Sequence, residues 1–177
     1  MESCKGSDLV GATIDIRGDD VKLSKDDAKA FRSLAARCNF LSADRPDIQY
    51  ACKEICRRMS EPSEGDWTLL KKLARHLKAH PRQVCMFQYQ DAPTELSIIV
   101  DTDYGGCKRT RKSTNGGLAM LGKHVIKTWS STQAVVTRSS GEAEYYGVTR
   151  GACEGIGILG LISDLNGHTM KINLSND

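Results

Sequence analysis

The stretch RSSGEAEYYGVTRGACEGIGILGLISDLNGHTMKINLS, which runs from Arg138 to Ser175, predicts a long helix followed by a strand. Two serines and the glutamates Glu142 and Glu144 open a predicted helix that reaches about Leu165. The residues NGH then lead into a final strand, MKINLS. Because this helix and strand follow several upstream strands, the pattern predicts an α/β sheet with a crossover helix.

The upstream strands begin after Pro81, where the apolar period changes from helical to strand-like. VCMFQYQ at 84–90 and LSIIVDTD at 96–103 are predicted strands, separated by the turn residues DAPT. GGLAMLG and HVIKTWSS predict a hairpin with Gly122 and Lys123 at its turn.

The first half of the chain predicts a small helical unit, after a possible short strand at Ala12–Ile16. One helix is capped at Ser24, a second begins with Pro46 at its first position, and a third opens at Asp66. These helices are expected to pack through apolar residues on their inner faces: Phe31, Leu34, Ile48, Ile55, Trp67 and Leu77. The third helix also carries basic residues that form either a solvated face or a phosphate-facing surface: Lys71, Lys72, Arg75 and Lys78.

Bulk composition limits the class of protein. The 177 residues make one domain or two small ones, and 40% hydrophobic with 27% charged residues argues against disorder. The net charge of +3 permits an anionic partner without demonstrating one. Because neither a long apolar run nor a signal-peptide core is present, we expect an intracellular protein, cytoplasmic or nuclear, with no membrane partner. Seven cysteines without a CxxC pair and four scattered histidines leave oxygen ligands as the only credible metal donors.

The two glutamates of the predicted helix point in nearly opposite directions, since successive helical residues turn by about 100°. The face of Glu142 is predicted to lie on the sheet, and the face of Glu144 to be more exposed. The Glu142 face comprises Tyr146, Thr149, Cys153, Ile156 and Gly160, and the Glu144 face comprises Val148, Gly151 and Gly155. An alternative role for Glu142 is a capping box with Ser139, in which the glutamate accepts a backbone N–H.

Other acids end strands. Asp101 ends an apolar strand, Asp103 follows on the same side, and Asp177 ends the last strand. Each aspartate taken alone is typical of a turn. Together with Glu142 they predict a cage of oxygen ligands, which suits Mg²⁺.

The chain from about Ser24 resembles a segment of copia-type retrotransposon Pol polyproteins. RPDIQYACKEICRRMSEPSEGDWTLLKKLARHLK is similar to the end of their reverse transcriptase region. IVDTDYGGCKRTRKSTNGG, KTWSSTQ and SSGEAEY resemble, in order and spacing, the ribonuclease H domain that follows. The family's threonine and tryptophan in these motifs are replaced here by Gly141 and Tyr104, neither of which would be a metal ligand.

The resemblance implies an α/β fold: a truncated ribonuclease H-like sheet with a crossover helix, preceded by a small helical segment. Residues 1–82 would be the helical tail of the reverse transcriptase or connection segment, and 84–177 a ribonuclease H-like domain that is incomplete at its C-terminus. The upstream reverse transcriptase domain of a parent polyprotein would be a partner. No polymerase activity is expected, since the polymerase aspartates would precede Met1.

The implied activity is that of a magnesium-dependent endonuclease, a hydrolase that cuts the RNA strand of an RNA–DNA hybrid by two-metal catalysis. Asp101, Glu142 and Asp177 would be the catalytic metal ligands for Mg²⁺, or for Mn²⁺ in its place. The truncated domain is expected to be weakly active or inactive. A basic run follows Asp101 and is either a solvated loop or a contact for the hybrid backbone: Lys108, Arg109, Arg111 and Lys112. Two alternatives remain open, a non-catalytic nucleic-acid-binding retroelement remnant and an unrelated small α/β protein.

Overall fold

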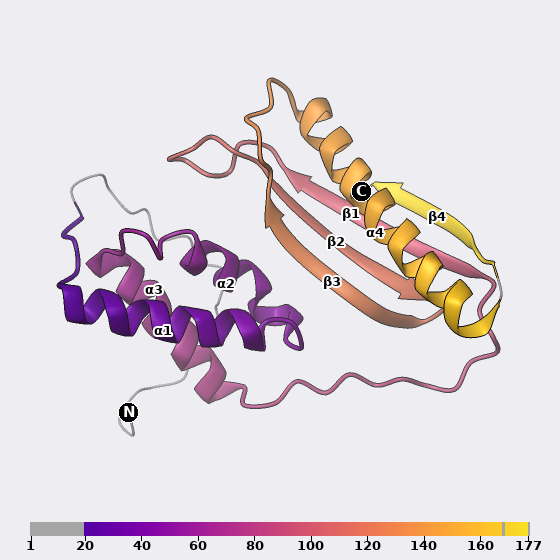
Figure 1. Ribbon diagram of the computed structural model, residues 1–177, viewed down its shortest axis with the longest axis horizontal. Coiled ribbons are helices and arrows are strands. Elements are labelled where there is room, and N and C mark those ends of the chain that lie inside the picture. The colour runs from indigo at the N-terminus through magenta and orange to yellow at the C-terminus, as the bar shows by residue number, and fades with distance from the viewer. Residues whose placement is uncertain (1–19, 168, 177) are drawn as a thin grey trace. The chain divides into compact units, whose positions relative to one another are not determined.

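The computed structural model describes residues 20–167 and 169–176 of the chain (Figure 1). These residues divide into two compact units, with the boundary between Cys85 and Met86. The possible strand at Ala12–Ile16 lies outside the described residues.

The first unit is helical. It contains α1 (Lys25–Leu41), the short 3-10 helix η1 (Pro46–Ile48), α2 (Gln49–Cys56) and α3 (Glu64–Ala79). Ser24 caps α1 as predicted, because its hydroxyl accepts the backbone N–H of Asp27 at 3.1 Å. Pro46 occupies the first position of η1, also as predicted.

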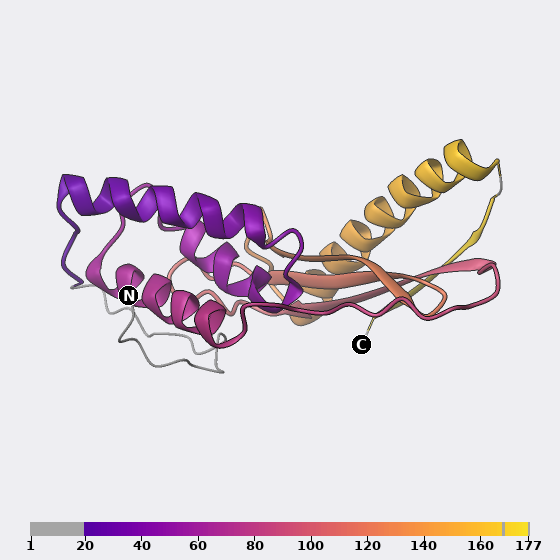
Figure 2. The same ribbon diagram turned by 90° about the horizontal axis from the view of Figure 1, so that it is seen from below.

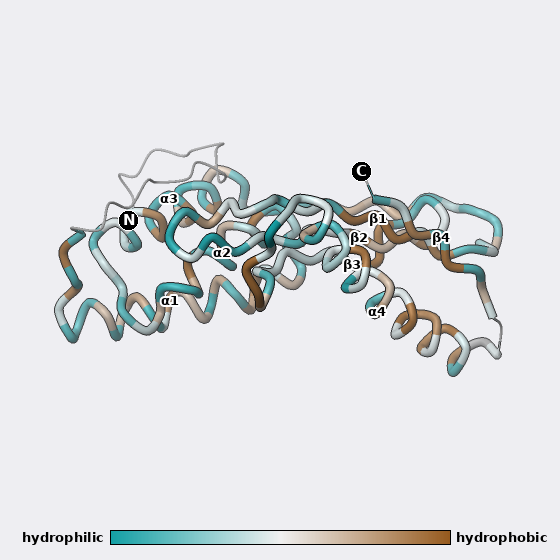
Figure 3. Tube along the Cα trace, turned by 90° about the horizontal axis from the view of Figure 1, so that it is seen from above, coloured by the Kyte–Doolittle hydropathy of each residue, from teal (hydrophilic) through white to brown (hydrophobic). Residues whose placement is uncertain are grey.

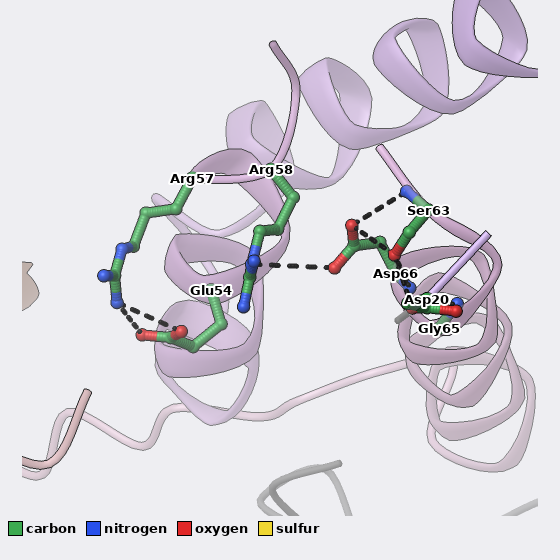
Figure 4. A network of polar contacts seen from close by, with 7 residues as sticks. All are labelled: Asp20, Glu54, Arg57, Arg58, Ser63, Gly65 and Asp66. Carbon is green, nitrogen blue, oxygen red and sulfur yellow. Dashed lines mark hydrogen bonds and ion pairs between the residues drawn. The ribbon is translucent and has the colours of Figure 1, made fainter. Parts of the chain in front are cut away.

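The start of α3 differs from the prediction, since the helix begins at Glu64 rather than Asp66. Ser63 is its N-cap, and Asp66 completes a capping box by accepting the backbone N–H of Ser63 at 2.9 Å. Figure 4 shows the carboxylate of Asp20 joining this cap, where it accepts the hydroxyl of Ser63 at 2.6 Å and the N–H of Gly65 at 2.9 Å. Asp66, the predicted first residue of this helix, is therefore its third residue and forms part of the cap.

The core of the helical unit comprises Phe31, Ala35, Ile48, Cys52, Ile55, Leu70 and Leu73. Trp67 and Leu77 pack against it and are partly buried, as the helical spacing predicted. The prediction is wrong for Leu34, which remains 40% exposed. Its neighbour Ala35 faces the core instead, and one step along a helix turns a side chain by about 100°.

The second unit is a four-stranded sheet with one long helix. Its strands are β1 (Glu95–Asp103), β2 (Thr114–Leu121), β3 (His124–Thr132) and β4 (Lys171–Asn176), in the spatial order β3-β2-β1-β4. The β1–β2 and β2–β3 pairs are antiparallel, whereas β1 and β4 are parallel and are connected through α4 (Ser140–Asn166). The predicted α/β sheet with a crossover helix is confirmed, as is the hairpin turn at Gly122, whose φ is +60°.

The predicted strand VCMFQYQ is wrong, because residues 84–90 have no strand structure. Their last residue instead holds the hairpin turn: Gln90 donates to the carbonyl of Leu121 at 2.9 Å and accepts the N–H of Lys123 at 2.7 Å. The ring of Phe87 lies edge-on to His124 at 5.1 Å between centroids. The alternating apolar residues of this segment imitate a strand pattern. In the structure, the side chain of Gln90 instead forms hydrogen bonds with backbone groups of the β2–β3 turn that have no partner within the sheet.

The helix α4 lies on one face of the sheet, and its carboxyl-terminal end rises away from the strands (Figure 2). Apolar residues concentrate along α4 and on β1 and β4 beneath it (Figure 3). The buried core comprises Leu96, Ile98, Val100, Ala119 and Trp129. Val148, Ile158 and Leu159 of α4 pack against this core.

The predicted orientation of α4 is wrong. Gly147, Gly151 and Gly155 are buried against the sheet, whereas Tyr146 is 40% exposed and Ile156 is 65% exposed. A Cβ on Gly151 would lie 2.6 Å from Val100 Cγ1, so only glycine permits this approach. The side of the helix that follows Glu144 therefore faces the strands.

Candidate active site at the start of α4

Asp101 lies near the carboxyl end of β1, opposite Gly116 of β2, and is exposed. Its neighbours Val100 and Thr102 face α4, since Cβ atoms on Gly151 and Gly147 would meet their side chains. Because side chains alternate along a strand, the Asp101 carboxylate projects from the opposite face at this edge. Asp103 shares that face.

Glu142 makes the contacts of a helix cap. Its backbone N–H donates to Ser139 Oγ at 3.2 Å, and its carboxylate accepts the backbone N–H of Arg138 at 2.7 Å. These are the contacts expected of the capping alternative. A role for Glu142 as a metal ligand stays a prediction.

Glu144 reaches toward the end of β4. Its carboxylate accepts the hydroxyl of Ser140 at 3.1 Å and the side-chain N–H of Asn176 at 3.4 Å. Asn176 pairs with Val100, the residue immediately before Asp101. The helical spacing of the sequence predicts Glu144 on the more exposed side of the helix, which is wrong. The missed signal was the glycine spacing after it, at Gly147 and Gly151, which is typical of close approach between a helix and a sheet.

A buried glutamine fixes the first turn of α4 against the sheet. Gln133 is 4% exposed, and its Nε2 donates to Asn115 Oδ1 at 2.6 Å and to the carbonyl of Ala143 at 2.8 Å. Thr102 Oγ1 and Gln133 Oε1 are buried nearby and have no hydrogen-bond partner among the described residues. The two hydrogen bonds of Gln133 therefore hold the start of α4, which carries both glutamates, against β2.

The basic loop after β1 is partly fixed by its own contacts. Lys112 donates to the carbonyl of Ala134 at 2.6 Å, and Tyr104 donates to the carbonyl of Arg138 at 3.0 Å. Arg109 and Arg111 are exposed, and Arg111 has a φ of 55°. Their predicted contact with nucleic acid stays a prediction.

The predicted oxygen cage is incomplete in the part of the chain that the structure describes. Within residues 20–167 and 169–176, no three Asp, Glu, His or Cys side chains gather closely enough to hold a metal ion. Asp177, the third predicted ligand, lies outside the described residues. The described carboxylates near this edge are those of Asp101, Asp103, Glu142 and Glu144. Over the same residues, no helix is both long and apolar enough to span a membrane.

Comparison with known proteins places the chain among retroelements. It is 34% identical over 128 residues to an uncharacterized mitochondrial protein of Arabidopsis thaliana, covering 72% of this chain and 53% of that protein. It is 32% identical over 139 residues to the retrovirus-related Pol polyprotein from transposon RE2 of the same plant, covering 78% of this chain and 10% of the polyprotein. The corresponding polyprotein from transposon TNT 1-94 of Nicotiana tabacum is 27% identical over 156 residues, covering 88% of this chain and 11% of the polyprotein.

No family model and no solved structure matches the chain. The chain spans 53% of the mitochondrial relative and about a tenth of each transposon polyprotein. The chain belongs to the family of copia-type, retrovirus-related transposon Pol polyproteins.

Proposed function

We propose that residues 84–177 form a ribonuclease H-like domain that hydrolyses the RNA strand of an RNA–DNA hybrid with bound divalent cations. The observation that carries this proposal is the topology β3-β2-β1-β4, with β1 and β4 parallel and α4 connecting them. This topology brings the carboxyl ends of β1 and β4 and the first turns of α4 to one edge of the sheet. Kinship with transposon Pol polyproteins supports a nucleic-acid substrate.

The donors at this edge suit the proposed metal. Carboxylate oxygens are the protein ligands that Mg²⁺ prefers, and Mn²⁺ accepts the same set. Asp101, Glu142 and Asp177 are the ligands that the family resemblance implies. Glu144 is a further candidate, because its carboxylate contacts Asn176 at the end of β4, whereas the Glu142 carboxylate is held by a backbone N–H.

The chain's own residues would position the hybrid and the acids. When bound, divalent cations would activate water and neutralise the developing charge on the leaving oxygen. Arg109 and Arg111 lie on the exposed loop after β1 and would contact backbone phosphates. Gln133 would hold the start of α4, which carries both glutamates, against β2.

A metal titration of the full chain tests the proposal. Mn²⁺ or Mg²⁺ at ten times its Kd should raise the Tm of the sheet unit by roughly 6–11 °C, since binding to the folded state alone contributes about 1.4 kcal/mol. Asp101→Asn should abolish this rise. The matched pair Glu142→Gln and Glu144→Gln identifies which glutamate holds the metal. Loss of the rise in Glu142→Gln would support the ligand that the family resemblance implies, whereas loss in Glu144→Gln alone would support Glu144 and leave Glu142 as a cap, since glutamine at 142 can still cap the helix.

Hydrolysis is measured separately, with a labelled RNA–DNA hybrid and with RNA alone and a DNA duplex as controls. Cleavage of the hybrid that requires metal and Asp101 would support a ribonuclease H activity. An unchanged Tm in the parent chain would refute the metal site. If metal and hybrid both bind without any cleavage, the non-catalytic nucleic-acid-binding alternative is favoured.

A further inference from the structure

A groove lies between the carboxyl-terminal half of α4 and the β2–β3 hairpin, and it encloses about 420 Å³. The end of α4 that forms one wall rises away from the strands (Figure 2). The walls are mainly aliphatic and comprise Leu121 and Ile126 of the hairpin with Ile158, Leu161, Ile162 and Leu165 of α4. We call this space the α4 groove.

Large aliphatic side chains of the α4 groove are open to solvent. Leu161 is 59% exposed, Leu165 is 73% exposed and Ile126 is 42% exposed. The helix between Gly155 and Ile162 contains no polar side chain. A helix with so little polar surface is normally covered by an apolar neighbour, so the groove suits an apolar occupant.

One end of the groove is charged. Glu154 pairs through Oε2 with Lys127 Nζ and through Oε1 with Arg150 Nη2, each at 2.5 Å. The hydrogen bond from Lys127 lowers the pKa of Glu154, with a further contribution from Arg150, against the opposing effect of burial. Two cations therefore share one carboxylate and leave one positive charge.

This charged end selects an anion. Both oxygens of Glu154 already bind a cation, whereas the ammonium group of Lys127 and the guanidinium group of Arg150 keep further N–H donors. The two cationic side chains are about half exposed, at 46% and 51%, so those donors are within reach of a ligand. An added cation would meet two like charges at the same place.

The size of the groove favours a small molecule over a protein. Nine described residues line it, whereas a stable protein interface typically uses about 20–30 residues a side. Its volume lies in the range of roughly 300–1,000 Å³ that is typical of small-ligand sites. None of the nine lining residues is aromatic, so the walls match an aliphatic chain better than a planar ring.

We propose that the α4 groove binds a single-chain amphipathic carboxylate, such as a medium-chain fatty acid. The aliphatic chain lies against Ile158, Leu161 and Leu165, and the carboxylate accepts hydrogen bonds from Lys127 and Arg150. The helix rises roughly 16 Å from Glu154 to Leu165, at about 1.5 Å per residue, which gives the chain room to extend. This site is independent of the proposed hydrolysis, because none of the nine lining residues is Asp101, Glu142 or Glu144.

Three ligands of equal chain length test the choice of charge. The full chain is titrated by calorimetry at neutral pH with octanoate, 1-octanol or octyltrimethylammonium, each below the concentration at which it forms micelles. Octanoate should saturate at one molecule per chain and bind about tenfold more tightly than 1-octanol, because its carboxylate forms charge-assisted hydrogen bonds. The cationic ligand should bind most weakly. Equal affinities for the three ligands, or binding of octanoate that does not saturate, would overturn the proposal.

Two variants of the ion pairs should change octanoate binding in opposite directions. Lys127→Gln should weaken it about tenfold and leave 1-octanol binding unchanged, since only the carboxylate uses this donor. Glu154→Gln should strengthen it by roughly threefold or more, because the competing carboxylate is removed from both cations. If both variants weakened octanoate binding equally, the ion pairs would have only a structural role and the proposal would fail.

The aliphatic wall is tested with a matched pair of exposed residues on α4. Leu161→Ser should weaken the binding of octanoate and of 1-octanol by about fivefold, because apolar contact area is lost. Ile156→Ser is the control, since Ile156 is 65% exposed and is not among the nine lining residues. Circular dichroism should show that both variants remain folded, and Asp101→Asn should bind octanoate as the parent does. Equal losses in the two serine variants would contradict the site. A parent chain that binds no octanoate but sediments as a dimer, and that Leu161→Ser converts to a monomer, would make a second copy the occupant and overturn the proposal.

Discussion

At the residue scale, Asp47 connects the start of η1 with the end of α3. Its carboxylate accepts two hydrogen bonds from Arg45, at 2.9 and 2.7 Å, and lies 2.9 Å from His76 Nε2. Arg45 also donates to the carbonyl of His80 at 3.0 Å. Hydrogen bonding from Arg45, with a smaller contribution from His76, lowers the pKa of Asp47 to about 2 against the opposing effect of burial.

Asp47→Asn should therefore change how stability depends on pH. Because the folded-state pKa lies below the ordinary value of 3.8, the contribution of Asp47 is complete above about pH 5 and is lost as the pH falls toward 2. The variant should lose about 1–3 kcal/mol at pH 7, since buried Arg45 loses its charged partner. Between pH 5 and 2 its free energy of unfolding should fall less than that of the parent. Urea unfolding followed by circular dichroism measures both effects, with exposed Asp44→Asn as the control. Parallel pH profiles for Asp47→Asn and the parent would contradict this assignment.

At the element scale, the sequence predicted the existence and length of α4 but not its orientation. Ser139, the first-turn acid and the end near Leu165 are local signals, and each is reproduced by the structure. The buried face is made by glycines, which carry no hydrophobic signal, while Tyr146 and Ile156 imitate a core-facing side. For the same reason the sequence could not place Glu144 beside Asn176. Nor could it assign a role to Gln133, because the partners of Gln133 come from β2 and α4 and meet only in the folded sheet.

The two kinds of glycine in α4 give opposite expectations for substitution by alanine. A Cβ at Gly151 would approach Val100 to 2.6 Å and Ile98 to 3.1 Å, so Gly151→Ala should destabilise the sheet unit by about 1–3 kcal/mol. Gly160 has open space around its Cβ position, and Gly160→Ala should stabilise by about 0.5–1 kcal/mol through helix propensity. Urea unfolding of the two variants compares them directly. Effects of the same sign would show that α4 does not rest on the sheet through its glycine face.

At the scale of the whole molecule, each unit has a core of its own. The helical unit buries Phe31, Ile48 and Ile55 among its helices, and the sheet unit buries Ile98 and Val100 beneath α4. Periodicity was sufficient to predict both units, because helical and strand spacing are properties of short segments. It failed at residues 84–90, where Gln90 bonds to a hairpin turn that lies more than 30 residues further along the chain.

Separate cores imply that the two units fold separately. Residues 1–85 produced alone should give a helical circular dichroism spectrum, and residues 86–177 a mixed helix and strand spectrum, because every buried contact within each core is retained. Added in proportion to their lengths, the two spectra should reproduce that of the full chain.

The division at Cys85 can be checked with a second pair, 1–90 and 91–177, which separates Gln90 from the β2–β3 turn. The second sheet piece should then unfold at a lower temperature than 86–177, since the turn loses its bonds to Gln90. A disordered spectrum for either piece of the first pair would show that the units depend on one another.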